Sequence, residues 1–509
     1  MISKTYSFGL LGLEAYLVEI EIDVAAGLPQ VTLVGLADTA IKESKERVRS
    51  AIKNSGFQWP AQRITINLAP SNIKKEGACF DLAIALGILA ATEQINGELL
   101  RNYAFLGELS LDGRLRPVHG VLPISLAMAN LPLKNLILPE ENAKEAGIVP
   151  EISAWPQKSL KETMHFLTDP GSRQPFKLVI EENLIPNANY NLDFCEVKGQ
   201  YFAKRALEVA VAGGHNIILL GPPGSGKTML AKRIPTIMPS LSLQEALEIT
   251  KIHSVAGTLL NQDGFMGTRP FRSPHHGISD VALIGGGSIP KPGEISLSHY
   301  GVLFLDELPE FSRKALETLR QPLEDNLICI SRIKRSLIFP ACFILAAALN
   351  PCPCGNYFNP QKPCHCNPAK IRNYLGKISG PLLDRIDIHI EVPQVKYREL
   401  TETNNAESSQ AIRQRVENAR RIQRERFKST KIFCNAQMQG RLIKEVCLLN
   451  KEAQELIRMA IAELGLSARG YDKILKVSRT IADLEQKEII CQEHVAEAIQ
   501  YRSLDKLLN

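Results

Sequence analysis

The chain has 509 residues and a mass of 56.3 kDa, enough for about three domains of ordinary size. Hydrophobic residues make up 45% and charged residues 22%, which excludes a mainly disordered chain. The 60 Lys and Arg exceed the 54 Asp and Glu only slightly, so the net charge of +6 permits a nucleic-acid partner without arguing for one. No apolar run reaches the ~18 residues of a membrane span, and the N-terminus lacks the pattern of a secretory signal. We therefore expect a cytoplasmic protein with no membrane partner.

The first segment, residues 1–168, is predicted to be an α+β domain. Alternating strands are expected at 17–22, 31–34 and 63–68, with a helix that begins after Asp38. Residues 80–89 are apolar and are expected to form a buried helix. A polar, turn-rich stretch follows, and we place a linker at 169–192.

The middle segment, residues 193–398, is predicted to be an α/β domain. Its short strands are continuously apolar, a pattern typical of a parallel sheet covered on both faces; they are 217–220, 302–305 and 343–346. Residues 399–509 are expected to be almost entirely helical. Within them the Arg-rich stretch 413–431 is interspersed with acids, which favours a solvated helix face.

A phosphate-binding loop follows the first of these strands. The sequence matches G-x-x-x-x-G-K-[ST] in full, with a strand before it and a helix after it, through Gly221, Pro222, Pro223, Gly224, Ser225, Gly226, Lys227 and Thr228. Glycines let several N–H groups converge on phosphate oxygens at the positive end of a helix. We expect ATP here, with Lys227 on the β- and γ-phosphates and the Thr228 hydroxyl on Mg²⁺.

Two acids end the next apolar strand, VLFLDE. Asp306 is predicted to hold Mg²⁺ and Glu307 to orient and polarise the attacking water, because phosphoryl transfer depends more on positioning than on covalent chemistry. The alternative for Glu307 is a solvated acid at the end of a strand.

Four cysteines lie close together in the pattern C-x-C-x₉-C-x-C: Cys352, Cys354, Cys364 and Cys366. Two thiolate pairs on either side of a short loop can surround one ion tetrahedrally, and Zn²⁺ is the usual occupant of an all-sulfur site. We predict a structural zinc insert over 352–366. The alternative is a reduced loop with no specific metal.

Together these segments resemble a known family. GPPGSGKT, VLFLDE and a strand ending in AAALN resemble AAA+ ATPases, and PFRSPHHGISDVALIGGGSIPKPGEISLSHYGVLFLDELPEF with SGPLLDRIDIHIEVP resembles the magnesium-chelatase-like proteins of the competence-protein ComM type (also called YifB-type). The resemblance implies that Asn350 is the sensor-1 residue and that residues 399–509 form the helical lid. It also implies that Arg385 is an arginine finger, as in minichromosome-maintenance helicases, and that Arg469 is sensor 2, with Arg479 as its competitor. An ion pair of Arg385 with Asp384 or Asp387 is the structural alternative.

The resemblance further implies that six copies of the chain form a ring, a hexamer, with DNA in its channel. In this clade two insertions project into that channel: residues 271–300, and a hairpin over 327–339 with Arg332, Lys334 and Arg335 near its tip. A basic hairpin there suits a phosphate backbone. The alternative is a solvated, charged turn.

Residues 1–168 resemble the Lon-protease-like domain, which has the fold of ribosomal protein S5 domain 2. Cys79 falls near the position of the Lon nucleophile, but residues 120–125 carry no lysine where the general base should lie. An unassisted thiol is not activated, so no peptidase activity is predicted.

The function implied by the resemblance is an ATP-dependent DNA motor, a branch-migration helicase acting in recombination during natural transformation. Two alternatives stay open. One is an ATPase subunit of a metal-insertion complex like magnesium chelatase. The N-terminal domain argues against it, because we do not expect such a domain in that subunit. The other is an AAA+ protease.

Overall fold

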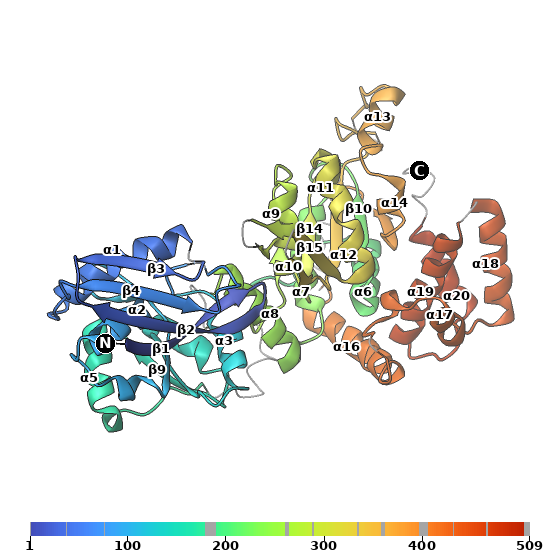
Figure 1. Cartoon of the computed structure of the whole chain (residues 1–509). Helices are drawn as coiled ribbons and strands as arrows, with labels where there is room; N and C mark the ends of the chain where they lie inside the picture. The colour runs from blue at the N-terminus through green and yellow to red at the C-terminus, as the bar shows by residue number, and fades with distance from the viewer. Residues whose placement is uncertain are drawn as a thin grey trace. The chain divides into compact units, whose positions relative to one another are not determined.

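The computed structural model describes residues 2–36, 38–75, 77–178, 190–259, 264–287, 290–332, 335–357, 362–395, 406–430, 432–464 and 467–502. The chain divides into two compact units (Figure 1). The first comprises Met1–Leu184 and Leu243–Gly267, and the second comprises Ile185–Ser242 and Thr268–Asn509. Part of the predicted linker, 179–189, lies outside the described residues.

The first unit is built on a seven-stranded sheet in the order β3-β4-β2-β1-β5-β8-β9. Its strands are β1 (Ile2–Leu11), β2 (Glu14–Ala25), β3 (Gln30–Val34), β4 (Arg63–Ala69), β5 (Tyr103–Phe105), β8 (Asn135–Pro139) and β9 (Ser153–Gln157), with a small pair β6 (Glu108–Leu109) and β7 (Leu115–Arg116). Its helices are α1 (Thr39–Asn54), α2 (Asp81–Ala91), α3 (Val121–Met128), α4 (Ala143–Ala146), α5 (Leu160–Thr168) and α8 (Leu243–Ala256). The predicted α+β character of this region is thus present, with Asp38 capping α1 through a hydrogen bond from the Ile41 N–H.

Helix α2 is the centre of this unit. Every one of its residues is buried, because the helix is apolar on all sides and its neighbours cover all of them. Its single acid, Asp81, accepts hydrogen bonds from Ser44 and from Arg47, which lies 2.8 Å away, so the buried charge has partners.

Helix α8 lies within the predicted middle segment but packs with the first unit. It follows the phosphate-loop helix in sequence, within the segment 193–398 that we predicted to be one continuous domain, yet it belongs to the first unit. Leu247 of α8 and Phe265 after it pack against the apolar cluster around α3. The Ser254 hydroxyl donates to the buried Glu145 carboxylate, and the Ser254 carbonyl accepts from the Gly120 N–H at 3.1 Å. The apolar pattern of α8 indicates a helix, but it does not indicate which core the helix joins.

The second unit contains a five-stranded sheet in the order β11-β14-β17-β10-β18 with every neighbouring pair parallel. The strands are β10 (Ile217–Leu220), β11 (Phe271–Arg272), β14 (Val302–Leu305), β17 (Ile344–Leu349) and β18 (Ile388–Glu391). Strands β10, β14 and β17 are buried along their whole length, as expected for a sheet covered on both faces. Their carboxyl ends meet at one edge, which brings together the three segments that follow them.

Helices and two hairpins surround this sheet. The helices are α6 (Tyr201–Gly213), α7 (Lys227–Ile237), α9 (Asp280–Ile284), α10 (Glu294–Leu297), α11 (Arg313–Thr318), α12 (Arg320–Asp325), α13 (Pro368–Leu375) and α14 (Gly380–Leu383). The hairpins are β12 (Gly285–Gly286) with β13 (Lys291–Pro292), and β15 (Leu327–Arg332) with β16 (Arg335–Pro340). The remaining helices, α16 (Ser409–Arg426), α17 (Arg441–Val446), α18 (Lys451–Leu464), α19 (Ala468–Leu484) and α20 (Gln492–Gln500), form the C-terminal helical region of the unit.

Three arginines of α16 do not lie on the solvated face that we predicted, whereas Arg421 and Arg424 are exposed as expected. Arg413 donates to the Thr236 carbonyl, Arg415 pairs with Glu208 and Glu407, and Arg420 donates to the Val211 carbonyl. These three arginines pack α16 onto α6 and α7, and the mixed charge of the sequence could not distinguish this role from solvation.

Across the described ranges, no helix combines the length and the apolar character needed to cross a bilayer.

Candidate nucleotide site and cysteine cluster

The phosphate loop joins the end of β10 to the start of α7. Gly224 and Gly226 have φ angles of 76° and 90°, in the left-handed region that favours glycine. A Cβ at Gly221 would lie 2.2 Å from the Val392 carbonyl oxygen. The glycines of the motif are therefore required by backbone geometry and by close packing, in agreement with a loop whose N–H groups face a bound anion.

Lys227 opens α7 and is only 8% exposed. Its ammonium group donates to the carbonyls of Gly221 at 2.7 Å and Pro222 at 2.9 Å, and to Asn350 Oδ1 at 3.2 Å. Burial lowers its pKa, while the nearby charges of Asp306 and Glu307 favour the protonated form. The lysine thus links the loop to the predicted sensor at the end of β17.

Thr228 and Asp306 lie together, as a shared magnesium site requires. The Thr228 hydroxyl donates to Asp306 Oδ2 at 2.7 Å, and the other Asp306 oxygen accepts from the Glu307 N–H at 3.0 Å. A hydroxyl and a carboxylate oxygen are ligands that Mg²⁺ prefers, so these two residues fit the ion.

Glu307 follows Asp306 with a φ of 53°, a left-handed conformation that is unusual for a residue with a side chain. Its carboxylate is 55% exposed and lies 3.9 Å from His276 Nε2. His276 itself packs on His275, with ring centroids 4.0 Å apart. This histidine pair lies in the segment 271–300 that we expected to project into the channel, and its distance from Asp306 in sequence concealed its proximity to Glu307.

Tyr374 of α13 is a second residue near the site that we did not predict. The backbone N–H of Asn350 faces its hydroxyl, and burial raises its pKa to about 12, with further contributions from Glu310 and Glu307. Tyr374 therefore contributes a neutral, buried group beside the carboxylates.

Arg385 lies just after α14. Its guanidinium donates to the Pro381 carbonyl and pairs with Glu324 of α12. The acid that pairs with it is thus neither Asp384 nor Asp387, the two that the sequence suggested.

Asp387 is held by other partners. It lies 3.4 Å from His215 Nδ1 and 3.6 Å from Lys473 Nζ of α19. Burial favours the protonated acid, but Lys473 and His215 outweigh it and hold the pKa of Asp387 below its usual range.

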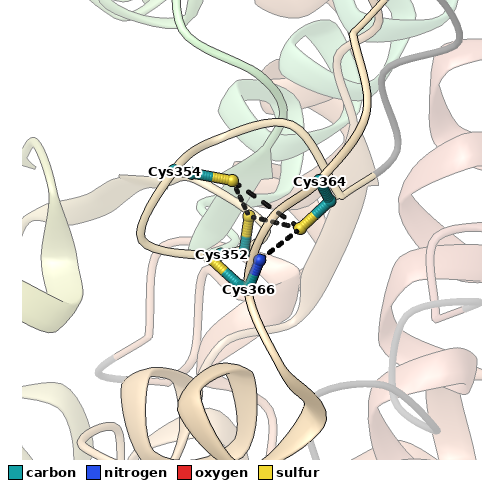
Figure 2. A group of neighbouring side chains, drawn as sticks. All are labelled: Cys352, Cys354, Cys364 and Cys366. Atoms are coloured by element: carbon teal, nitrogen blue, oxygen red, sulfur yellow. Dashed lines mark hydrogen bonds between the residues drawn. The ribbon is translucent and has the colours of Figure 1, made fainter.

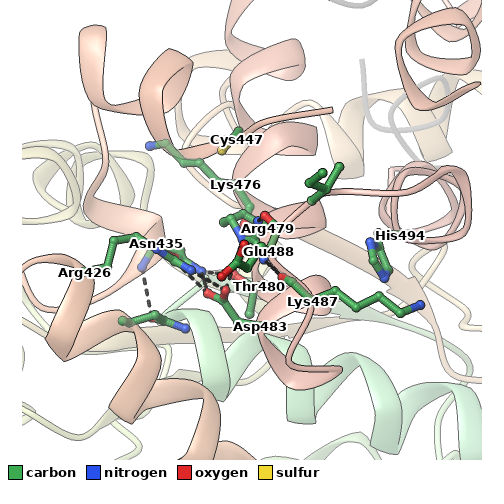
Figure 3. A network of polar contacts seen from close by, with 12 residues as sticks. Arg426, Asn435, Cys447, Lys476, Arg479, Thr480, Asp483, Lys487, Glu488 and His494 are labelled. Atoms are coloured by element: carbon green, nitrogen blue, oxygen red, sulfur yellow. Dashed lines mark hydrogen bonds and ion pairs between the residues drawn. The ribbon is translucent and has the colours of Figure 1, made fainter. Parts of the chain in front are cut away.

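The two arginines considered for sensor 2 have different surroundings. Arg479 is 1% exposed, and it donates to Asp483 at 3.0 Å and to the carbonyls of Lys487 and Glu488. Figure 3 shows this network among the C-terminal helices. Arg469 is 64% exposed in the first turn of α19, 3.8 Å from Asp384. Arg479 therefore has a packing role inside the lid, and Arg469 is the arginine of the pair that is open to a ligand.

The four cysteines converge as a metal site requires (Figure 2). The four sulfur atoms all lie within 4.8 Å of one another, and three pairs are 3.3, 3.6 and 3.7 Å apart. Tetrahedral zinc with Zn–S bonds of ~2.3 Å would place its sulfurs ~3.8 Å apart, so the cluster fits this ion closely. Hydrogen bonds from the backbone of Asn356 and His365 lower the pKa of Cys354 to about 6, which makes it a ready thiolate ligand.

Comparison with known proteins matches the whole chain. Family models described as "Magnesium chelatase, subunit ChlI" and "Magnesium chelatase, subunit ChlI C-terminal" match residues 193–400 and 406–502. The competence protein ComM of Haemophilus influenzae is 45% identical over 99% of this chain and 98% of its own. The YifB protein of Salmonella typhimurium, described as uncharacterized, is 42% identical over 98% of this chain and 96% of its own.

This chain belongs to the magnesium-chelatase-like AAA+ ATPases of the ComM type. The family confirms the identity inferred from the motifs, and it implies ATP and Mg²⁺ as cofactors and ATP hydrolysis as the reaction.

The N-terminal region of this ComM-type ATPase has two kinds of relative. A model described as "Subunit ChlI of Mg-chelatase" matches residues 20–142. The Lon protease of Brevibacillus choshinensis is 25% identical over 29% of this chain and 20% of its own. Because of the first match, the N-terminal domain no longer distinguishes this chain from magnesium chelatase, as we had expected it to.

Cys79 lies just before α2, with its sulfur 3.9 Å from the Phe8 carbonyl. Burial raises its pKa to about 12, so the thiol is protonated at neutral pH and is a weak nucleophile. Lys75, the lysine closest to it in sequence, donates to the Pro70 carbonyl. These contacts suit packing better than catalysis.

The hairpin β15–β16 exists as predicted. Its strands pair in antiparallel register from Leu327↔Pro340 to Arg332↔Arg335, so both arginines lie at the same end of the hairpin. Lys334 lies outside the described residues.

Proposed function

We propose that this ComM-type ATPase is an ATP-driven motor on DNA, a ring-forming branch-migration helicase that acts in recombination during natural transformation. One observation carries the proposal: Lys227 is hydrogen-bonded to Asn350 and Thr228 to Asp306, in a chain that matches a protein named for competence over nearly its full length.

The ATP site would work through residues on three strand ends. The loop N–H groups and Lys227 would hold the phosphates, and Thr228 with Asp306 would hold Mg²⁺, which neutralises charge on the phosphate oxygens when bound. Glu307 would orient water toward the terminal phosphorus. Asn350, hydrogen-bonded to Lys227, is suited to sense whether that phosphate is present.

Arg385 would complete the site of a neighbouring subunit in a hexamer. Within one protomer it pairs with Glu324, which is half exposed. The Arg385 side chain is itself only 14% exposed, so to act as a finger it would have to leave Glu324 and turn outward to a phosphate oxygen when a neighbour binds. Arg469 would reach the nucleotide from the lid.

The β15–β16 hairpin would contact DNA through Arg332, Lys334 and Arg335. A basic sequence at this turn suits a phosphate backbone, and contacts of this kind weaken as salt concentration rises. The cysteine cluster would bind Zn²⁺ as a structural site.

The test is ATP hydrolysis by the purified full chain with and without DNA, followed by strand separation on forked and four-way substrates. We expect DNA to stimulate hydrolysis, and Arg332→Ala with Arg335→Ala to lose that stimulation while basal hydrolysis stays. Hydrolysis that is indifferent to DNA would contradict the proposal.

A second candidate is an ATPase subunit of a metal-insertion complex. The observation that favours it is that three segments match models described as magnesium chelatase subunit ChlI. Insertion of Mg²⁺ into a porphyrin by this chain with candidate partner subunits, together with no response to DNA, would favour it over the motor.

A further inference from the structure

The cysteine insert, residues 352–366, begins two residues after Asn350 and returns to the same site through α13. Cys352 is fully buried, and the Gly355 N–H donates to its carbonyl at 2.9 Å, forming a tight turn. After Cys366, the Asn367 side chain caps α13 through the Lys370 N–H at 2.8 Å. That helix carries Tyr374 back to the Asn350 backbone.

The turn of the insert packs directly on the phosphate loop. Gly355 is buried, with a φ of 77°, and a Cβ added there would lie 2.4 Å from Pro223 Cδ and 2.6 Å from Pro223 Cγ. Real side chains do not approach so closely, so this contact requires the glycine. Pro223 is a member of the phosphate-loop motif.

Three parts of the nucleotide site therefore depend on one insert. Pro223 rests on Gly355, Asn350 is continuous with Cys352, and Tyr374 is carried on the helix that follows Cys366. A metal ion that joins Cys352 and Cys354 to Cys364 and Cys366 would fix the spacing of all three, because it ties the two ends of the insert to each other.

We infer that the cysteine insert is the support on which the phosphate loop is positioned, so that tight nucleotide binding requires a metal-loaded insert with glycine at position 355. Gly355 and Pro223 are positioning residues that act on the loop. The inference rests on the proposed binding of ATP at this loop, and it deepens the structural role given to the zinc site.

The experiment measures the affinity of the full chain for a fluorescent ATP analogue, beside its zinc content and its thermal unfolding midpoint. Gly355→Ala should weaken binding about tenfold while zinc content stays at the wild-type level. Gly440→Ala is the matched control, because Gly440 also has a positive φ of 51° but has nothing within 4 Å of an added Cβ. It should bind the analogue as the wild type does.

A rescue separates positioning from general damage. Pro223→Ala removes Cγ and Cδ, the two atoms that an alanine at position 355 would meet. Gly355→Ala should therefore weaken binding of the ATP analogue much less in the Pro223→Ala chain than in the wild type. A merely structural role for Gly355 would not respond to the loss of these two atoms.

The metal is tested on the wild-type chain. Removal of zinc with a chelator should weaken binding of the analogue about as much as Gly355→Ala, and Zn²⁺ alone should restore it. Equal affinity of the zinc-free and zinc-loaded chains, or of Gly355→Ala and Gly440→Ala, would overturn the inference. A zinc-loaded wild type that binds no nucleotide would instead refute the proposed function.

Discussion

The phosphate loop and the loop that carries Cys79 both precede a buried helix, and both resemble catalytic segments of known families, yet they differ in what surrounds them. Lys227 has three hydrogen-bond partners contributed by its own loop and by the end of β17. The Cys79 thiol makes one long hydrogen bond, to the Phe8 carbonyl, and burial raises its pKa to about 12. A reactive residue type becomes a site only where the topology supplies its partners. In the second unit, three parallel strands ending at one edge supply them.

The sharpest test of the nucleotide side is the loss of the loop lysine. Lys227→Ala should abolish nucleotide binding and hydrolysis, because it removes the charge that meets the phosphates. Glu307→Gln should instead bind ATP and fail to turn it over. Isothermal titration with ATP and a phosphate-release assay distinguish the two variants. ATP hydrolysis by the Lys227→Ala chain would contradict the assignment of the phosphate loop as the nucleotide site.

Arg385→Ala should lower turnover on the order of 10³-fold while ATP binding stays intact, as expected of a finger that acts only in the transition state. Glu324→Gln is the control, because it frees the arginine without removing it. Mixing Arg385→Ala with Glu307→Gln chains should recover part of the activity if sites are shared between protomers. Normal turnover by Arg385→Ala alone would refute the role.

The boundary of the first unit is tested at α8. Ser254→Ala leaves the buried Glu145 carboxylate without its hydroxyl donor, so the free energy of unfolding should fall by about 1–3 kcal/mol. Lys251→Ala, which breaks an exposed ion pair with Glu14 at 3.1 Å, should cost less than about 1 kcal/mol. Urea unfolding of the two variants gives the difference, and equal costs would argue that α8 is loosely attached.

A smaller, pH-dependent effect is expected at His215, between Asp387 and Thr480. Burial lowers its pKa below 6.5, although Asp387 opposes the shift, so the unfolded chain binds more protons just below that pH. The histidine therefore costs stability as pH falls below 6.5, and His215→Gln should flatten that loss. Parallel pH dependences of the unfolding midpoint in the two chains would show that His215 is not the group responsible.

The smallest effect is expected in the N-terminal unit. Cys79→Ala should leave ATP hydrolysis unchanged, and neither chain should degrade casein, because the protonated thiol is not a nucleophile at neutral pH. Casein degradation by the wild type that is lost in Cys79→Ala would show that Cys79 is a catalytic nucleophile and not a packing residue.

Sequence alone predicted the parts of the site that are local in the chain or come at strand ends. The loop motif, the Asp306–Glu307 pair and the cysteine cluster are short patterns whose geometry follows from spacing. The partners of Arg385 and of the α16 arginines were not predictable in this way, because an arginine can choose among many acids and carbonyls once the chain is folded. We missed three features for the same reason, because each brings together segments that are distant in sequence. They are His276, Tyr374 and the contact of Pro223 with Gly355.

Helix α8 also bears on how the chain can be made and cut. The polypeptide passes between the two units three times, at 184–185, 242–243 and 267–268. The ribosome must therefore have synthesised β10 and the phosphate loop before the N-terminal core receives α8, so the first unit cannot complete its fold when residue 184 has emerged. A protease that cuts the chain once between 169 and 192 would leave the two units covalently joined, because the polypeptide also passes between them before and after α8.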